Sequence, residues 1–212
     1  MNDQDNSALR PLKTEPEYIE GERTNQMKKL IYAINLTADG CCDHTRQSPD
    51  EEHFEYFTQL MREFDVHIFG RKTYELMVPY WPDILKDPSA SKAETAFARA
   101  FVANTKVVFS RSLNSVEGSN TRLVRGDLRD EILKLKQEQE QGKNILVGGV
   151  DLPSQLIQLG LVDEYQFVIN PLIVGEGKRL MEGVSLPQRL QLKLAESKIF
   201  KSGCVALRYL KQ

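Results

Sequence analysis

The sequence predicts a three-layer α/β fold, in which helices cover both faces of a mostly parallel sheet and an antiparallel hairpin ends the chain. Short apolar runs of strand type alternate with amphipathic helical segments through most of the chain. The first run, residues 28–35, is apolar almost throughout, which is typical of a strand buried on both faces. Residues 190–200 and 204–210 alternate in polarity around a Gly-containing turn, which indicates a hairpin.

One domain is expected over residues 27–212, preceded by a flexible leader. Residues 1–26 are polar and charged and show no periodicity. The chain has 212 residues, of which 41% are hydrophobic and 27% charged, as in a soluble globular protein with a sizeable core. We find neither the apolar region of a secretory signal nor a run of transmembrane length.

Charge and cysteine content narrow the choice of partners and compartment. The formal net charge of −2 gives no electrostatic case for binding nucleic acid or an anionic membrane. The chain has three cysteines, and Cys41 and Cys42 are adjacent, which argues against a disulfide framework and fits the cytoplasm. Because Cys41, Cys42 and His44 are crowded together, they do not have the spacing of zinc ligands, and no metal site is expected.

The first helix is expected to follow a polar loop. Ser48 can cap it, Pro49 can occupy its first turn, and acidic residues such as Asp50 and Glu51 suit the positive end of the helix dipole. Apolar residues then recur at helical spacing to about Phe64, which indicates an amphipathic helix.

The remaining elements follow from the same patterns. We expect an irregular segment around Pro79, Trp81, Pro82 and Pro88, because proline interrupts helices. The other predicted elements are strands over 66–69, 106–109, 121–124, 145–147 and 165–169, and helices over 74–77, 93–103, 127–141 and 151–159.

A pair of glycines, Gly148 and Gly149, ends the strand that begins near Asn144. Without a Cβ atom, glycine lets backbone N–H groups approach a ligand closely. A helix is predicted to begin at Asp151, with Pro153 in its first turn, and a helix N-terminus attracts phosphate. Taken alone, the stretch is explained equally well by a tight strand-to-helix turn without a ligand.

Polar and basic residues follow several of the predicted parallel strands, and ligands of such sheets bind outside the carboxyl ends of the strands. Arginine can grip a phosphate with two hydrogen bonds, each worth roughly 1.5–3 kcal/mol. Three phosphate-binding strand ends predict a ligand with more than one phosphate, and NADPH meets that demand. The alternative is that Arg71, Lys72 and Arg111 are solvated loop charges.

Several motifs resemble those of known reductases. Residues 70–75, Gly-Arg-Lys-Thr-Tyr-Glu, resemble a motif of the dihydrofolate reductases, as do the strand end at 108–111 and the glycine pair. Further motifs resemble a branch of that family, the reductase domain of bacterial riboflavin biosynthesis (the RibD C-terminal domain). They are the Thr37-Ala38-Asp39-Gly40 turn, the segments 160–164 and 171–177, and the closing Ser202 to Val205.

The resemblance implies a dihydrofolate reductase-like three-layer sandwich, NADPH binding and a small-molecule substrate, and it suggests a homodimer. It places residues 70–73 at the pyrophosphate and the 2′-phosphate, residues 110 and 111 at the 2′-phosphate, residues 148–150 on the nicotinamide side, and the loop from Asp39 to His44 over the nicotinamide. The cofactor-binding residues expected in this way are Thr37, Asp39, Gly40, Gly70, Arg71, Lys72, Thr73, Ser110, Arg111, Gly148, Gly149 and Val150.

The chain departs from the dihydrofolate reductases near the substrate. Cys41 to His44 replace their Pro-Trp, and the first helix has four acidic candidates in place of a single buried carboxylate, namely Asp50, Glu51, Glu52 and Glu55. We take Asp39, Glu52 and His53 as the candidates for a catalytic group.

The function expected from these features is an NADPH-dependent oxidoreductase that transfers a hydride to a small metabolite, such as a pterin or a deaminated riboflavin precursor. Two alternatives remain. One is a nucleotide-binding or regulatory protein without catalysis on the same fold, because a fold does not fix a function. The other is a domain that binds proteins through an apolar groove.

Overall fold

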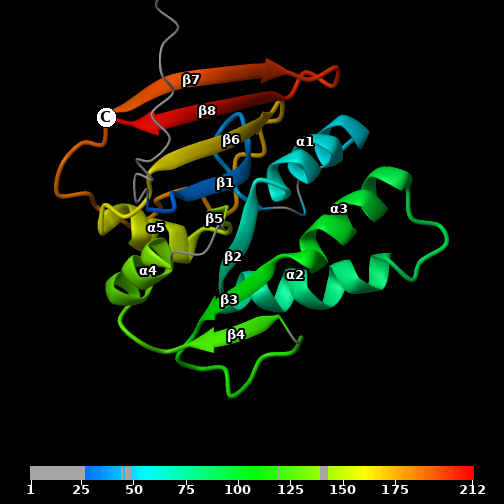
Figure 1. Cartoon of the computed structure of the whole chain (residues 1–212). Coiled ribbons are helices and arrows are strands. Elements are labelled where there is room, and N and C mark those ends of the chain that lie inside the picture. Colours follow the sequence, from blue (N-terminus) through cyan, green and yellow to red (C-terminus); the bar gives the residue numbers. More distant parts are fainter. Residues whose placement is uncertain (1–26, 44, 46–48, 119, 139–142) are drawn as a thin grey trace, which may run out of the picture.

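The computed structural model describes residues 27–43, 45, 49–118, 120–138 and 143–212. The predicted leader, residues 1–26, and His44 lie outside the described residues. The described chain confirms the predicted fold class, with eight strands in one sheet in the order β4-β3-β2-β5-β1-β6-β8-β7 (Figure 1). The strands are β1 Leu30–Thr37, β2 Phe64–Gly70, β3 Thr105–Phe109, β4 Thr121–Val124, β5 Asn144–Val147, β6 Glu164–Asn170, β7 Leu192–Ile199 and β8 Val205–Lys211.

Helices cover both faces of the sheet and complete a three-layer sandwich (Figure 1). One face packs against α4 and α5 through a core that includes Ile132 and Leu156, and the other packs against α1, α2 and α3 through a core that includes Phe97 and Phe101. The helices are α1 Glu51–Met61, α2 Arg71–Ile84, α3 Lys92–Ala103, α4 Leu128–Gln137 and α5 Asp151–Gln158.

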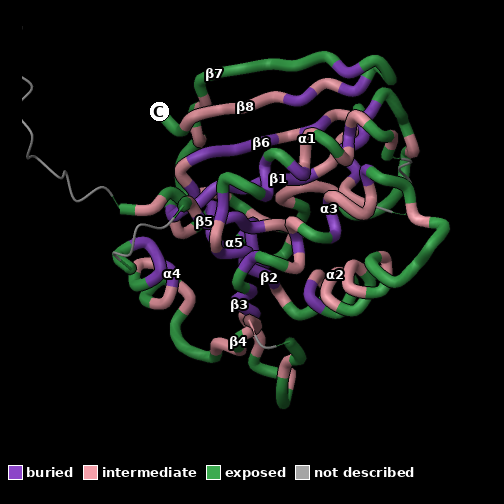
Figure 2. The backbone as a smooth tube through the Cα atoms, turned by 45° about the vertical axis from the view of Figure 1, so that its right-hand side comes forward, coloured by how far each residue is buried: buried purple, intermediate pink, exposed green. Residues whose placement is uncertain are grey.

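The sheet is parallel from β4 to β6 and antiparallel at its C-terminal edge. Strand β8 runs antiparallel to both β6 and β7, so the predicted hairpin is confirmed. Burial decreases toward that edge: β1 is buried along almost its whole length, whereas the residues of β7 after Leu192 are exposed (Figure 2). The continuous apolar run of the first strand thus correctly indicated burial on both faces.

The first helix starts and ends differently from the prediction. Asp50 is its N-cap, and the Asp50 side chain accepts a hydrogen bond from the backbone N–H of His53 at 2.8 Å. The predicted cap, Ser48, lies outside the described residues. The helix ends at Met61, and Phe64 already begins β2. The Phe64 side chain is buried in the core on the α1–α3 side of the sheet.

The prediction of an irregular segment around the prolines was wrong for Pro79 and Pro82, because α2 continues through both of them. Each proline removes one helical N–H donor. Packing offsets that loss: the Trp81 ring, next to Pro82, lies 4.5 Å from the Phe97 ring and 6.1 Å from the Phe54 ring, measured between centroids. Tertiary contacts of this kind override local preference.

Other element boundaries move by a few residues. The N-cap role of Asp127 is confirmed, but α4 ends at Gln137. The first strand runs two residues further than predicted, to Thr37, and β2 begins at Phe64 where residue 66 was expected. None of the described helices is long and apolar enough to cross a membrane.

Candidate functional site

Strand β5 is shorter than its two neighbours at the carboxyl edge of the sheet. Its last residue, Val147, pairs with Tyr32 of β1 and Ile68 of β2. Both neighbours continue beyond that level, β1 to Thr37 and β2 to Gly70. Beyond Val147 no strand of the described chain lies between β1 and β2, and we call this position in the sheet the β5 recess; it is bordered by residues 33–37, 69–70 and 148–149. One position at the carboxyl edge is therefore bordered by the extended backbone of β1 and β2 and by the glycine pair that follows β5.

Two helices begin at this recess, directly after neighbouring strands. Strand β2 leads into α2 at Arg71, and β5 leads through the glycine pair into α5 at Asp151. Their first turns are in close contact, because a Cβ atom added at Gly70 would lie 3.5 Å from the Cβ of Leu152. At Gly149, whose φ is +86°, an added Cβ would overlap the hydroxyl of Thr73. The turn at 148–149 therefore depends on glycine.

Neither helix has a side-chain cap, in contrast to the other three. Gly70 and Val150 occupy the N-cap positions of α2 and α5 without a side-chain hydrogen bond. By comparison, Asp50, Ser91 and Asp127 cap α1, α3 and α4. The first N–H groups of a helix require acceptors. Two adjacent uncapped helix starts thus suit an anionic ligand.

Basic side chains surround the same two helix starts. Lys72 lies 3.8 Å from Asp151 in the first turn of α5, and Lys178 forms an ion pair with the same carboxylate. Arg71 pairs with Glu75 one turn along α2 at 3.1 Å. All of these side chains are exposed, so their pairing is weak and exchangeable with a ligand.

Ser110 and Arg111 lie at the carboxyl end of β3, next to the end of β2. Phe109 pairs with Gly70, so Ser110 and Arg111 follow β3 beside the start of α2. The Ser110 hydroxyl accepts hydrogen bonds from the backbone N–H groups of Ser112 at 3.2 Å and Leu113 at 3.1 Å. This hydroxyl therefore shapes the turn that carries the exposed Arg111 side chain.

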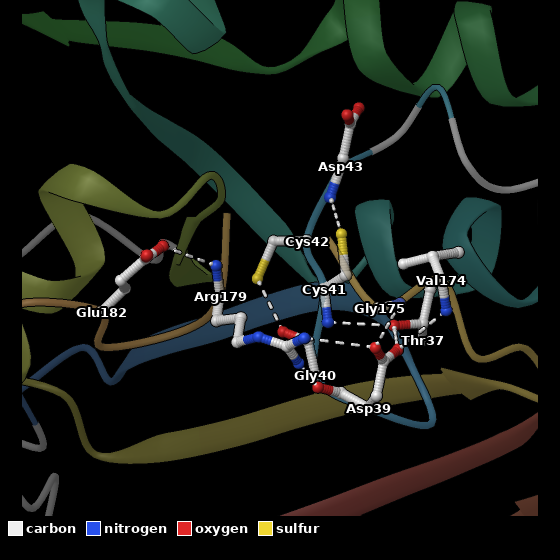
Figure 3. A network of polar contacts seen from close by, with 10 residues as sticks. All are labelled: Thr37, Asp39, Gly40, Cys41, Cys42, Asp43, Val174, Gly175, Arg179 and Glu182. Atoms are coloured by element: carbon white, nitrogen blue, oxygen red, sulfur yellow. Dashed lines mark hydrogen bonds and ion pairs between the residues drawn. The ribbon is translucent and has the colours of Figure 1, made fainter. Parts of the chain in front are cut away.

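The loop after β1 is docked onto the segment that follows β6 (Figure 3). The Asp39 carboxylate accepts hydrogen bonds from the Thr37 hydroxyl at 2.5 Å and from the backbone N–H of Gly175 at 2.9 Å, and Arg179 lies 3.3 Å away. The hydrogen bond from Thr37 is the main reason that the pKa of Asp39 is well below its ordinary value of 3.8. Asp39 is therefore ionised at neutral pH and occupied in joining two loops.

Two further contacts fix the same pair of loops. Cys41 forms an isolated antiparallel bridge with Arg179, and the Cys42 backbone N–H donates to the carbonyl oxygen of Lys178 at 2.8 Å. A side chain at Gly177 would approach the Cys41 sulfur to 2.7 Å, so the close docking requires glycine there. The docked loops deliver Lys178 to the first turn of α5. The sequence reasoning missed this lysine, although it directly follows the segment 171–177 noted there.

The two other catalytic candidates lie on α1. Glu52 accepts a hydrogen bond from the backbone N–H of Lys201 at 2.8 Å and thereby holds the turn of the β7–β8 hairpin. His53 is 3% exposed, and its Nε2 lies 2.9 Å from the Asn35 side-chain oxygen, on the part of β1 that borders the recess. Burial lowers the pKa of His53 below its ordinary value, so its imidazole is neutral at neutral pH.

No group of three or more His, Cys, Asp or Glu side chains within the described ranges could hold a metal ion. The polar atoms at the carboxyl edge are instead backbone N–H groups, lysine and arginine side chains, and the paired carboxylates of Asp39, Glu75 and Asp151. Such a set attracts phosphate groups.

The parallel sheet with helices on both faces, and with two uncapped helix starts at its carboxyl edge, places the chain in the class of three-layer α/β proteins. The chain belongs to the RibD C-terminal domain family, which matches residues 28–206. The resemblance drawn from the motifs is thereby confirmed.

Two uncharacterised proteins of Bacillus subtilis strain 168 are similar along most of their length. YyaP is 31% identical over 192 residues, which cover 88% of this chain and 97% of YyaP. YwjB is 24% identical over 176 residues, which cover 78% of this chain and 90% of YwjB.

Solved structures share the fold at low sequence identity. A pyrimidine reductase-like protein of Corynebacterium diphtheriae has a TM-score of 0.60 and 14% identity, covering 92% of this chain and 96% of its own. The riboflavin biosynthesis reductase of Saccharomyces cerevisiae has a TM-score of 0.57 and 16% identity. The match covers 91% of this chain and 93% of that reductase. The dihydrofolate reductase-like architecture expected from the sequence is thus confirmed.

Proposed function

We propose that this protein is an NADPH-dependent reductase that transfers a hydride to a small planar or carbonyl-bearing metabolite, such as a pterin or a deaminated riboflavin precursor. The observation that carries the proposal is the pair of uncapped helix starts, α2 and α5, which meet at the β5 recess. Membership of the RibD C-terminal domain family supports the same chemistry.

The phosphate groups of the cofactor account for the charges at the edge of the sheet. The first turns of α2 and α5, with Thr73, Lys72 and Lys178, would hold the pyrophosphate. Ser110 and Arg111, at the end of β3, would flank the 2′-phosphate, assisted by Arg71. These basic side chains are exposed, so a phosphate can replace their present carboxylate partners.

The β5 recess would receive the nicotinamide ring. Gly148, Gly149 and Val150 would lie on one side of the ring, and the loop from Thr37 through Asp39 and Gly40 would lie on the other. When bound, NADPH supplies the hydride, which requires no covalent bond to the protein. The protein contributes orientation and exclusion of water. The docking of Asp39 onto Gly175 keeps this loop in place.

His53 is the best placed of the three candidates to assist the substrate. The carboxylates of Asp39 and Glu52 are already bound by backbone N–H groups of other loops. His53 contacts Asn35 beside the recess, and burial keeps its imidazole neutral, so it can offer a hydrogen bond at neutral pH. We assign it a substrate-binding role on the α1 side of β1.

The same involvement of Asp39 and Glu52 in loop contacts favours a second candidate function, nucleotide binding without catalysis. Such a protein would bind NADPH and turn over no substrate. We further propose that the protein acts in the cytoplasm as a homodimer, which light scattering of the purified protein would test.

The proposal is tested by titrating the protein with NADPH and following cofactor fluorescence. Arg71→Ala combined with Arg111→Ala should weaken binding by roughly tenfold or more. Arg99→Ala, which removes an exposed arginine from α3, is the control and should leave affinity unchanged. No binding by the unaltered protein at high micromolar NADPH would refute the reductase. Binding without turnover of pterins, flavin precursors or carbonyl compounds would support the second candidate.

A further inference from the structure

His67 is a polar side chain in the apolar centre of the sheet. It lies on β2 and pairs with Leu146 of the neighbouring strand β5. Its ring is 4% exposed and packs between Phe69, with centroids 4.0 Å apart, and Phe101, at 5.9 Å. An aliphatic residue would satisfy this environment better, because a buried imidazole needs hydrogen-bond partners.

The ring is not satisfied by the protein around it. Among the described residues, the buried Nδ1 of His67 has no hydrogen-bond partner. The other ring nitrogen, Nε2, points toward Gly148, because it is the atom nearest to the position that a Gly148 Cβ would take, at 3.6 Å. The backbone carbonyl oxygen of Ala33 lies 3.9 Å from the same position. The absent side chain thus leaves His67 facing the β5 recess.

We propose that His67 binds the ring end of the cofactor, with its Nε2 hydrogen-bonded to the carboxamide of the nicotinamide across Gly148. This inference rests on the proposed function and adds to it a residue outside the expected motifs. The Nε2 atom faces the bare glycine, and a ligand amide at this position would give it a hydrogen-bond partner, whereas Nδ1 stays within the core. The glycine provides the approach that a side chain would close.

The charge state of His67 fits a neutral amide. Burial, together with the nearby Lys106 ammonium, lowers the pKa of His67 to about 3. The ring is therefore uncharged over the physiological range, with one N–H donor and one acceptor nitrogen. Nε2 donates or accepts according to the tautomer, and a carboxamide offers an acceptor oxygen or a donor N–H for either case. His67 thus orients the ring and does not supply a proton.

The first test compares His67→Leu with the unaltered protein by NADPH titration and thermal unfolding. We expect NADPH to bind roughly 5- to 10-fold more weakly, as for loss of one hydrogen bond. The affinity for 2′,5′-ADP, which has no nicotinamide, should be unchanged. The melting temperature should stay the same or rise, because an unpaired polar group is removed. Phe97→Leu, on α3 in the same apolar core and outside the recess, is the control and should lower the melting temperature without changing NADPH affinity.

Two further measurements keep the result clear if His67→Leu folds poorly. Gly148→Ala adds a methyl group at ordinary contact distance from the ring, so it should fold, weaken NADPH binding and combine non-additively with His67→Leu. In protein with ¹⁵N-labelled histidine, NADPH should shift the Nε2 signal of His67, whereas 2′,5′-ADP should not. The chain has only three histidines, so the signal is assignable.

The outcomes separate the two proposals. Failure of the unaltered protein to bind NADPH overturns the reductase and, with it, this contact. Normal NADPH binding with an unshifted His67 signal and unchanged affinity in His67→Leu overturns only the contact. Equal weakening of NADPH and 2′,5′-ADP in that variant also overturns it, because the effect would then come from general disturbance of the site.

Discussion

The hydroxyl of Tyr32 donates a hydrogen bond to the carbonyl oxygen of Gly149 at 2.8 Å. Tyr32 is fully buried on the α4–α5 side of β1, and its ring lies edge-on to those of Tyr165 and Phe167. Burial raises the pKa of this tyrosine well above its ordinary value, so the hydroxyl remains a donor. The glycine turn, which faces the proposed ligand, is therefore held from inside the core.

Tyr32→Phe should destabilise the protein and loosen the glycine turn. It removes the hydroxyl and leaves the Gly149 carbonyl oxygen unpaired, which costs roughly 1–3 kcal/mol of unfolding free energy. Urea unfolding followed by circular dichroism measures the loss. Tyr165→Phe, in the same aromatic cluster, is the matched control and should cost less. Equal losses in the two variants would contradict the role given to the Tyr32–Gly149 bond.

The two glycines of the turn should differ in their tolerance of alanine. At Gly149, φ is +86° and an added methyl group overlaps the Thr73 hydroxyl, so Gly149→Ala should cost at least about 1–2 kcal/mol in backbone strain alone. Gly148 has ordinary φ and only normal contacts, so Gly148→Ala should unfold close to the unaltered protein. Thermal unfolding of the two variants measures this difference in stability, and equal melting temperatures would contradict the prediction.

Asp151→Asn should tighten NADPH binding. The Asp151 carboxylate pairs with Lys72 and Lys178 and places a negative charge in the first turn of α5, where a phosphate is proposed. Its removal should improve affinity about fivefold, a gain of ~1 kcal/mol. The gain should shrink at high salt.

The control for this charge change is Asp83→Asn, which breaks a comparable exposed pair with Lys86 at the far end of α2. That variant should bind NADPH like the unaltered protein. Weaker binding by Asp151→Asn would show that the carboxylate holds the two lysines for the ligand and does not compete with it.

Acid should destabilise the protein through His67. Its folded pKa of about 3 lies below the ordinary value of 6.5, so the unfolded chain binds the proton more readily. The free energy of unfolding should therefore fall as the pH drops from about 6.5 toward 3, with little contribution from this group above that window. Urea unfolding at a series of pH values should show a shallower fall for His67→Leu. Parallel curves for the two proteins would contradict the prediction.

The parts of the fold and site that depend on local sequence could be predicted. Apolar runs located the central strands, and parallel topology then brought the strand ends at Gly70, Ser110 and Gly148 to one edge. Proline preference failed for α2, because the packing of Trp81 against Phe97 is a tertiary contact.

Features that join distant parts of the chain could not be predicted. The sequence around Asp39 predicts a turn. In the fold, Asp39 contacts Gly175, which is 136 residues away along the chain. Lys178 reaches α5 only because that docking brings it there. The orientation of His67 toward Gly148 likewise requires the pairing of β2 with β5. The partners of such side chains, and the directions in which they point, cannot be inferred from the residue pattern.

The docking of Asp39 onto Gly175 and Arg179 has a consequence for biosynthesis. The residues that hold the loop after the first strand, Gly175 and Arg179, are synthesised long after that loop. The neighbouring strand β6 pairs with β8, which is synthesised later still. A ribosome-bound chain that has exposed only its first 170 residues therefore lacks the brace for its ligand site. Chains cut short after β6 should therefore remain incompletely assembled and be more readily cleaved by proteases than the full chain.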